Sequence, residues 1–139
     1  MSADRARIAR LHRLERIRAV ARRNALAAAG QAEARLAQLQ ALAERTSAMI
    51  SDYAQRRDAQ DGAALQQAHR FMQGLHGIVG NTEQDIIRAR AIADQRAQEA
   101  ASAERSRAAV EDRADVEMRS LARKLASANT PTGGRRKRD

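Results

Sequence analysis

The sequence predicts an all-α protein: a long antiparallel two-helix coiled-coil hairpin with a disordered basic C-terminal tail. Two runs of small and apolar residues repeat every seven residues, and a short polar break containing Asp61 and Gly62 separates them. A seven-residue repeat keeps one face of a helix, its seam, against a partner helix. Because the break is short, we expect the two helices to fold back on each other.

The first helix is predicted over residues 4–57. Ser2 and Asp4 are residue types that cap the free amides of a first helical turn. Gly30 is the only glycine before Gln60, and no proline precedes it. The seam alternates steps of four and three residues through Ala25, Ala29, Ala32, Leu36, Leu39, Ala43, Thr46, Ile50 and Tyr53.

The second helix is predicted over residues 63–128, after a turn at 58–62. It ends before Pro131, because the residue preceding a proline is pushed out of helical geometry. Each of its three internal glycines costs roughly 1 kcal/mol relative to alanine. A helix that is broken at Gly80–Asn81 is therefore an alternative. The repeat keeps its phase through these residues, which favours one continuous helix. The seam runs through Leu65, Ala68, Met72, Leu75, Val79, Thr82, Ile86, Ala89, Ala93, Ala100, Ala103, Val110 and Ala114.

The sizes of the residues support a hairpin. If the turn centres on residues 59–60, residues whose numbers sum to about 119 face each other. The small residues from Ala27 to Ala34 then face isoleucines, and the stretch from Ala93 to Ala109 faces larger aliphatic residues. Such pairing of large with small is what interdigitated packing requires. The large residues are Ile86, Ile87 and Ile92 on the second helix and Leu11, Leu14, Ile17, Val20 and Leu26 on the first.

The net charge of +9 is concentrated at the two ends of the chain. Residues 1–30 carry a net +6, residues 31–134 are neutral, and residues 135–139 carry a net +3. The hairpin domain is predicted over residues 1–129, and the tail over residues 130–139 is too polar and charged to fold. No stretch approaches the roughly 18 apolar residues of a membrane span, and the N-terminus lacks the apolar core of a secretory signal. We therefore expect a cytoplasmic protein.

The residues of enzyme and metal sites are missing from the sequence. There is no cysteine, so disulfides and thiolate chemistry are excluded. His69 and His76 share a helix face but are about 10.5 Å apart, too far to bind one metal ion. Acidic residues alternate with arginines at helical spacing, as on a solvated helix face. We predict no enzyme, no catalytic or metal site, no cofactor and no small-molecule substrate.

Apolar residues beside the seam mark a candidate binding surface near the turn. A two-helix hairpin needs only one narrow seam, so a wider apolar stripe needs another use. Both aromatic residues of the chain belong to this stripe. The alternative is that these residues only thicken the packing or drive self-association. The stripe comprises Leu42, Thr46, Met49 and Tyr53 on the first helix and Phe71, Leu75, Ile78 and Thr82 on the second.

The basic N-terminal segment allows two further interpretations. It resembles the basic region of a nucleic-acid-binding helix that continues into a leucine zipper. However, Ile8, Leu11 and Leu14 occupy positions that a groove-binding helix keeps polar. It is also similar to an amphipathic helix that lies on an anionic membrane, but it has no aromatic anchor. Both interpretations remain alternatives to the one that follows.

The chain resembles the FliJ/YscO family, the coiled-coil stalk proteins of flagellar and injectisome type III secretion. The resemblance covers about residues 5–125. It rests on the segment RLHRLERIR, an alanine-rich heptad run, the stretch LAQLQALAERTSAMISDY, a glycine turn and then LQQAHRFMQGLHGIV. The chain departs from the family at Leu65 and Ala68, where larger residues are usual, and at residues 118–121, where the family has a Leu-Asp-Glu-like element.

The resemblance implies a non-enzymatic hairpin that binds in the centre of a hexameric export ATPase, contacts the membrane export gate and escorts export chaperones. It implies a cytoplasmic protein at the periphery of the inner membrane, held there by its partners. The family's exposed gate-binding patch corresponds here to Met49, Tyr53, Phe71, Leu75 and Ile78. We expect the basic end to face the ATPase through Arg5, Arg7, Arg10, Arg13, Arg16, Arg135, Arg136, Lys137 and Arg138.

Overall fold

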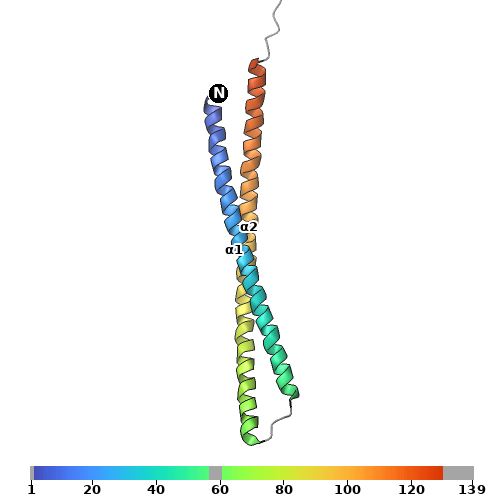
Figure 1. Cartoon of the computed structure of the whole chain (residues 1–139). Helices are drawn as coiled ribbons and strands as arrows, with labels where there is room; N and C mark the ends of the chain where they lie inside the picture. The colour runs from blue at the N-terminus through green and yellow to red at the C-terminus, as the bar shows by residue number, and fades with distance from the viewer. Residues whose placement is uncertain (1, 57–60, 130–139) are drawn as a thin grey trace, which may run out of the picture. The chain divides into compact units, whose positions relative to one another are not determined.

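The computed structural model describes residues 2–56 and 61–129, and all of these except Arg56 and Asp61 lie in two α-helices (Figure 1). Helix α1 spans Ser2–Gln55 and helix α2 spans Gly62–Asn129. The two helices pack against each other in opposite directions, which confirms the predicted all-α antiparallel hairpin. Most of the predicted turn and all of the predicted tail, with Arg135, Arg136, Lys137 and Arg138, lie outside the described residues.

Asp61 caps the start of α2. The backbone N–H of Ala64 donates to Asp61 Oδ1 at 2.7 Å, and the N–H of Leu65 donates to the Asp61 carbonyl at 3.1 Å. An aspartate that accepts from the third helical residue satisfies one of the free amides of the first turn. At the end of α1, the N–H of Arg56 donates to the Tyr53 carbonyl at 3.2 Å and closes a tight last turn.

Helix α2 is continuous through its three internal glycines. Gly74, Gly77, Gly80 and Asn81 are all helical, and no described glycine has a positive φ. The break at Gly80–Asn81 that the sequence left open is absent from the helix. The uninterrupted seven-residue repeat around these glycines is the physical reason, because packing of the seam residues outweighs low helix propensity.

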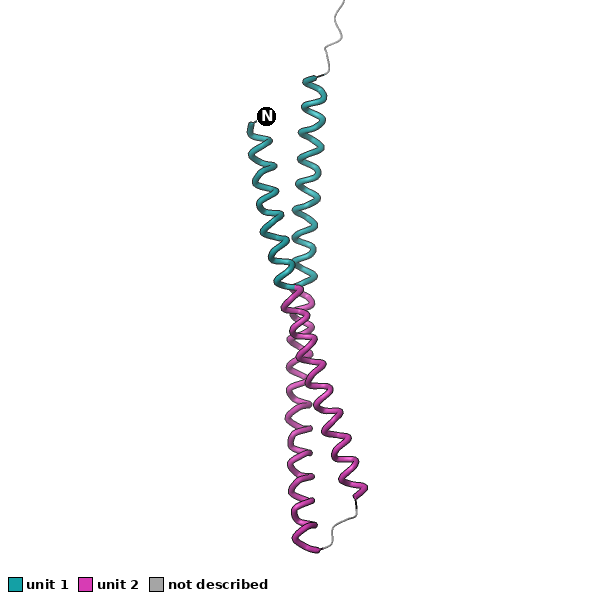
Figure 2. The backbone as a smooth tube through the Cα atoms, viewed as in Figure 1, with its two compact units in different colours: residues 1–25, 100–139 teal, residues 26–99 magenta. Residues whose placement is uncertain are grey.

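Contacts between the helices divide the chain into two units, each containing a segment of α1 and a segment of α2 (Figure 2). Unit 1 comprises Met1–Ala25 and Ala100–Asp139, and unit 2 comprises Leu26–Glu99.

Unit 2 has a core of leucine and alanine. Leu36, Leu39, Ala89 and Ala93 form one buried cluster, and Ala32 and Ile86 pack against it. The buried hydroxyl of Thr46 donates to the Leu42 carbonyl of its own helix at 2.8 Å, so its burial leaves no unpaired donor. Every predicted seam residue is buried or partly buried, with the single exception of Leu65.

Unit 1 is held by small apolar residues and by ion pairs between the helices. Ala100 and Ala114 are buried. Lys124 Nζ lies 3.1 Å from Asp4 Oδ2, and Arg7 Nη1 lies 3.5 Å from Glu117 Oε2. Arg22 forms a third ion pair across the helices with Glu104. These pairs have large sequence separations, so they connect the N-terminal half of α1 to the C-terminal half of α2.

The predicted pairing of facing residues is wrong by several positions. The numbers of contacting residues sum to 124 for Tyr53 with Phe71 and for Arg7 with Glu117, and to 126 for Arg22 with Glu104. Because the last turn of α1 contacts Phe71, the first turns of α2 extend beyond it. Leu65 on those turns is therefore 61% exposed.

The predicted pairing of large with small residues is found only in part: Ala32 packs beside Ile86 and lines a groove with Ile92. A seam of alanines brings the helices close together, so larger aliphatic residues at neighbouring positions lie outside it. Ile86 and Leu11 are partly buried, but the other residues predicted to interdigitate are exposed: Leu14, Ile17, Val20, Leu26, Ile87 and Ile92.

Candidate protein-interaction surfaces

One side of unit 2 carries a row of exposed apolar side chains. In heptad notation, with seam positions a and d, each of these residues occupies position g, directly before a seam residue. In an antiparallel pair the g positions of both helices lie on the same side. We call this row the apolar flank: Leu42 and Met49 on α1, and Phe71, Ile78 and Ile92 on α2, which are 37–51% exposed.

The opposite side of unit 2 is polar. It is formed by the e positions, directly after the second seam residue of each heptad. Apart from Leu26, Ala54 and Ala97, these positions carry polar or charged residues: Glu33, Gln40, Ser47, His69, His76, Glu83 and Arg90. The g side of unit 2, which also carries Arg35 and Asp85, is therefore the more apolar of its two sides.

Three of the predicted gate-binding residues, Met49, Phe71 and Ile78, are exposed and lie on the apolar flank. Tyr53 is partly buried, and its ring lies 4.6 Å from the Phe71 ring at a tilt of 39°. The Arg56 guanidinium lies 5.0 Å above the Tyr53 ring, within the range of a cation–π contact. The expectation that Leu75 is exposed is wrong: it is 5% exposed because it belongs to the seam.

A groove continues the apolar flank toward Ile92. It has a volume of about 210 Å³ and runs between α1 and α2. Its floor is made of small and apolar seam residues, and charged residues stand at its rim. The sequence pattern predicted Ile92 to pack against small residues and did not indicate this groove, although two seven-residue steps from Ile78, through Asp85, lead to it. The residues that line it are Ala32, Arg35, Leu39, Asp85, Arg88, Ala89 and Ile92.

The basic end lies on α1 within unit 1. Arg7 is engaged by Asp4, at 4.0 Å, and by Glu117. Within residues 2–56 and 61–129, no ion pair involves Arg5, Arg10, Arg13 or Arg16, and all four are exposed. These four arginines are therefore available to an acidic partner.

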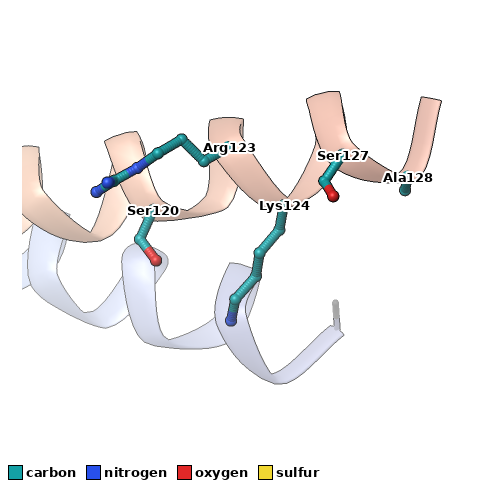
Figure 3. Close-up of a pocket in the computed structure, with 5 residues that line it drawn as sticks. All are labelled: Ser120, Arg123, Lys124, Ser127 and Ala128. Atoms are coloured by element: carbon teal, nitrogen blue, oxygen red, sulfur yellow. The ribbon is translucent and has the colours of Figure 1, made fainter. Parts of the chain in front are cut away.

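An open depression lies at the end of α2, lined by Ser120, Arg123, Lys124, Ser127 and Ala128 (Figure 3). Figure 3 shows Lys124 extending toward the neighbouring helix, where its ammonium group meets Asp4. The hydrogen bond from Lys124 lowers the pKa of Asp4. One of the two charged residues that line this depression, Lys124, is therefore already paired with Asp4.

Glu104 is the centre of a charge network in unit 1. It accepts hydrogen bonds from Arg107 at 2.8 and 2.9 Å and pairs with Arg22 across the helices. The bonds from Arg107, with a contribution from Arg22, hold the pKa of Glu104 at about 2. Glu104 and then Glu111 raise the pKa of Arg107. The lowered pKa keeps Glu104 ionised between two arginines, so the network links the two helices by charge.

In the described part of the chain, no three metal-binding side chains come together. Neither described helix contains a segment long and apolar enough to cross a membrane. The described residues thus define a two-helix hairpin with an apolar flank in unit 2 and exposed arginines in unit 1. The chain matches no protein-family model, no curated protein and no solved structure.

Proposed function

We propose that this chain is a non-enzymatic stalk or adaptor of a flagellar type III protein export apparatus. One observation carries the proposal: a hairpin that already has a complete seam also displays apolar anchors on one flank. Exposed aromatic and aliphatic anchors on a rigid helix are typical of protein-binding surfaces. The partner of this flank is the membrane export gate, which Phe71, Ile78 and Met49 contact.

The basic end binds the hexameric export ATPase. Arg5, Arg10, Arg13 and Arg16 supply exposed positive charge in unit 1. Charge complementarity with an acidic surface sets orientation and the rate of encounter, whereas apolar anchors determine the lifetime of a complex. Export chaperones are further partners. The protein is cytoplasmic and reaches the inner membrane through these partners.

The gate contact is tested by changing Phe71 and Ile78 together to serine. Both side chains are more than 40% exposed, so helicity measured by circular dichroism stays near wild type while gate binding is lost. Leu75 is left intact, because serine at this buried position would unfold the seam. The matched control is Ile87→Ser, at an exposed isoleucine outside the flank, which keeps full binding.

Co-purification from the native cells tests the identity of the partners. Recovery of a hexameric P-loop ATPase together with a membrane export protein supports the proposal. Gate binding that survives Phe71→Ser with Ile78→Ser overturns the role of the apolar flank. Recovery of the chain alone overturns the stalk function.

The exposed arginines also favour a second candidate function, binding of the N-terminal segment to nucleic acid or to an anionic membrane. Binding to nucleic acid would weaken steeply with a few-fold rise in salt, because counterions are released on association. Binding to a membrane would carry the protein to the top of a gradient with anionic vesicles. If the chain still binds the export ATPase at the raised salt concentration, the stalk function is favoured over nucleic-acid binding and over membrane binding.

A further inference from the structure

Within unit 1, helix α1 turns a side of basic and apolar composition away from α2 (Figure 2). Positions b, c and f are the three heptad positions furthest from the seam. Over residues 2–24 of α1, all residues at these positions are exposed and none is acidic. We call this side the outer face of α1. It comprises Ser2, Ala3, Ala6, Ala9, Arg10, Arg13, Arg16, Ile17, Val20, Arg23 and Asn24.

The positive charge of the outer face is not compensated by acids of the same helix segment. Residues 2–25 contain two acids, Asp4 and Glu15, and both are partly buried at seam positions. Asp4 pairs with Lys124 and lies 4.0 Å from Arg7, and Glu15 lies 3.2 Å from His12. Both acids are therefore already engaged. No ion pair with a described residue involves the four arginines of the outer face: Arg10, Arg13, Arg16 and Arg23.

Two aliphatic side chains lie among these arginines. The row Ile8, Leu11, Leu14, Ile17 and Val20 advances in steps of three residues, so it rotates gradually around the helix. Ile8 and Leu11 are partly buried, but the exposed fraction is 37% at Leu14, 64% at Ile17 and 45% at Val20. The row thus begins at the seam and ends on the outer face, where arginines and aliphatic side chains are neighbours.

Other outward sides of the hairpin have a different composition. Positions b, c and f of α1 over residues 27–55 carry both signs of charge and no apolar residue larger than alanine. The same positions of α2 over residues 101–116 also carry both signs of charge, as is typical of a solvated helix face. The charged residues are Glu44, Arg45 and Asp52 on α1 and Arg105, Asp112 and Asp115 on α2. The outer face of unit 1 is instead suited to a surface that supplies negative charge and accepts aliphatic groups.

We propose that the outer face of α1 binds the surface of an anionic lipid bilayer. A basic amphipathic helix lies in the plane of such a surface, with its arginines near the phosphate groups and its aliphatic side chains in the headgroup layer. A nucleic acid would pair with the arginines but would offer Ile17 and Val20 no apolar environment. Since both aromatic residues of the chain lie in unit 2, the arginines supply most of the affinity.

The inference develops the second candidate function and does not depend on the stalk function. It selects a lipid surface over nucleic acid and adds Ile17 and Val20 to the arginines. Because Arg10, Arg13 and Arg16 also belong to the proposed ATPase contact, the bilayer and the ATPase would compete for them. The proposed gate contact uses other residues, so gate binding stays intact in variants of the outer face.

Flotation of the full chain with vesicles provides the first test. Vesicles of equal parts phosphatidylglycerol and phosphatidylcholine are expected to carry the protein upward, whereas vesicles of phosphatidylcholine alone are not. Each arginine near an anionic surface contributes about fivefold in affinity, so Arg13→Gln with Arg16→Gln should weaken binding by about 25-fold. Arg45→Gln with Arg70→Gln is the matched control, because it removes the same charge from exposed positions of unit 2. The basic residues 135–138 are unchanged in all variants, so they do not account for a difference between them.

The aliphatic side chains distinguish a lipid surface from other anionic partners. Ile17→Ser with Val20→Ser keeps all arginines and should weaken vesicle binding by about fivefold or more, because two apolar groups are lost. Binding of double-stranded DNA should be the same in this variant as in the wild type. No binding to the anionic vesicles, equal binding to both kinds of vesicle, or unchanged vesicle binding in the serine variant overturns the proposal. Circular dichroism checks helicity, and the glutamine variant decides the case in which the serine variant loses it.

Fluorescent labelling provides the second test, because the chain has no native cysteine. An environment-sensitive dye on Ile17→Cys should shift its emission to the blue when anionic vesicles are added, since this position enters the headgroup layer. The same dye on Val116→Cys is the matched control, because Val116 is 51% exposed in the same unit but belongs to α2. Equal shifts at the two positions overturn the assignment of the lipid contact to the outer face of α1.

Discussion

The tightest residue of the seam is an alanine. Ala93 is 1% exposed and belongs to the cluster with Leu36 and Leu39. The small side chain at this point is enclosed between the two helices. Overpacking of a closely packed site forces side chains out of their preferred rotamers and shifts the backbone. We therefore expect the size of residue 93 to control the packing of unit 2.

Ala93→Leu is expected to lower the free energy of unfolding by about 1–3 kcal/mol. Ala91→Leu is the matched control, because Ala91 is exposed at position f of the same helix and the same change there meets only solvent. Urea denaturation followed by circular dichroism measures both. Equal effects at the two positions would contradict the close approach of the helices at Ala93.

Glu104 provides a pH-dependent contribution to stability. Its pKa is about 2 in the folded chain, compared with 4.5 for a glutamate without these interactions. Folding therefore favours its ionised form. A carboxyl with a lowered pKa stabilises the fold fully above its unfolded pKa, and this contribution is lost as the pH falls toward its folded pKa. The midpoint temperature of thermal unfolding should therefore decrease as the pH is lowered from 4.5 to 2. In Glu104→Gln the midpoint should fall less over this window, because the network with Arg22 and Arg107 is already weakened. An identical fall in both proteins would show that other carboxyls account for the loss.

At the scale of the element, α2 contains a stretch of low intrinsic helix propensity beside the apolar flank. Gly74, Gly77 and Gly80 lie inside the helix, and a Cβ added at any of them would have nothing within 4 Å. Alanine at each position should therefore stabilise the protein by about 0.5–1 kcal/mol, because glycine gives up more backbone freedom on folding. Gly62→Ala is the control and should gain less, since Gly62 lies in the first turn. Urea denaturation of the four variants measures the difference, and no gain at the internal positions would show an unfavourable contact or a role for flexibility.

The seam of both helices was predictable, but the residues that face each other were not. Seven-residue spacing determines which side of a helix is buried, and it placed Leu36, Leu39 and Ala93 correctly. It carries no information on how far one helix slides along the other. The observed offset puts Tyr53 beside Phe71 and leaves Leu65 exposed.

The candidate surface was predicted in part for the same reason. An apolar stripe wider than one seam located Met49, Phe71 and Ile78, which are exposed. It also included Leu75, which is buried, because a stripe drawn around a helix does not separate seam position d from its neighbour g. Following positions d and g separately in steps of seven residues would have assigned Leu75 to the seam and added Ile92 to the surface.

At the scale of the whole molecule, the chain is strongly charged at its ends and neutral between them. Residues 1–30 have a net charge of +6, and residues 31–134 have none. In unit 1, acidic residues of α2 pair with Arg7 and Arg22 of α1, and Arg5, Arg10, Arg13 and Arg16 stay exposed. Both units carry exposed apolar side chains, for example Ile17 in unit 1 and Phe71 in unit 2. The two units thus differ mainly in their surface charge.

The alanine-rich seam has a thermodynamic consequence for the hairpin. Buried side chains in the described residues are leucine, alanine and threonine only. Unfolding such a seam exposes little apolar surface, so the heat capacity of unfolding and the dependence on denaturant are small for a chain of 139 residues. Its stability curve is accordingly flat with temperature, and a ligand that binds only the folded hairpin raises the whole curve by mass action. The helices are thus stabilised most strongly wherever a partner is present.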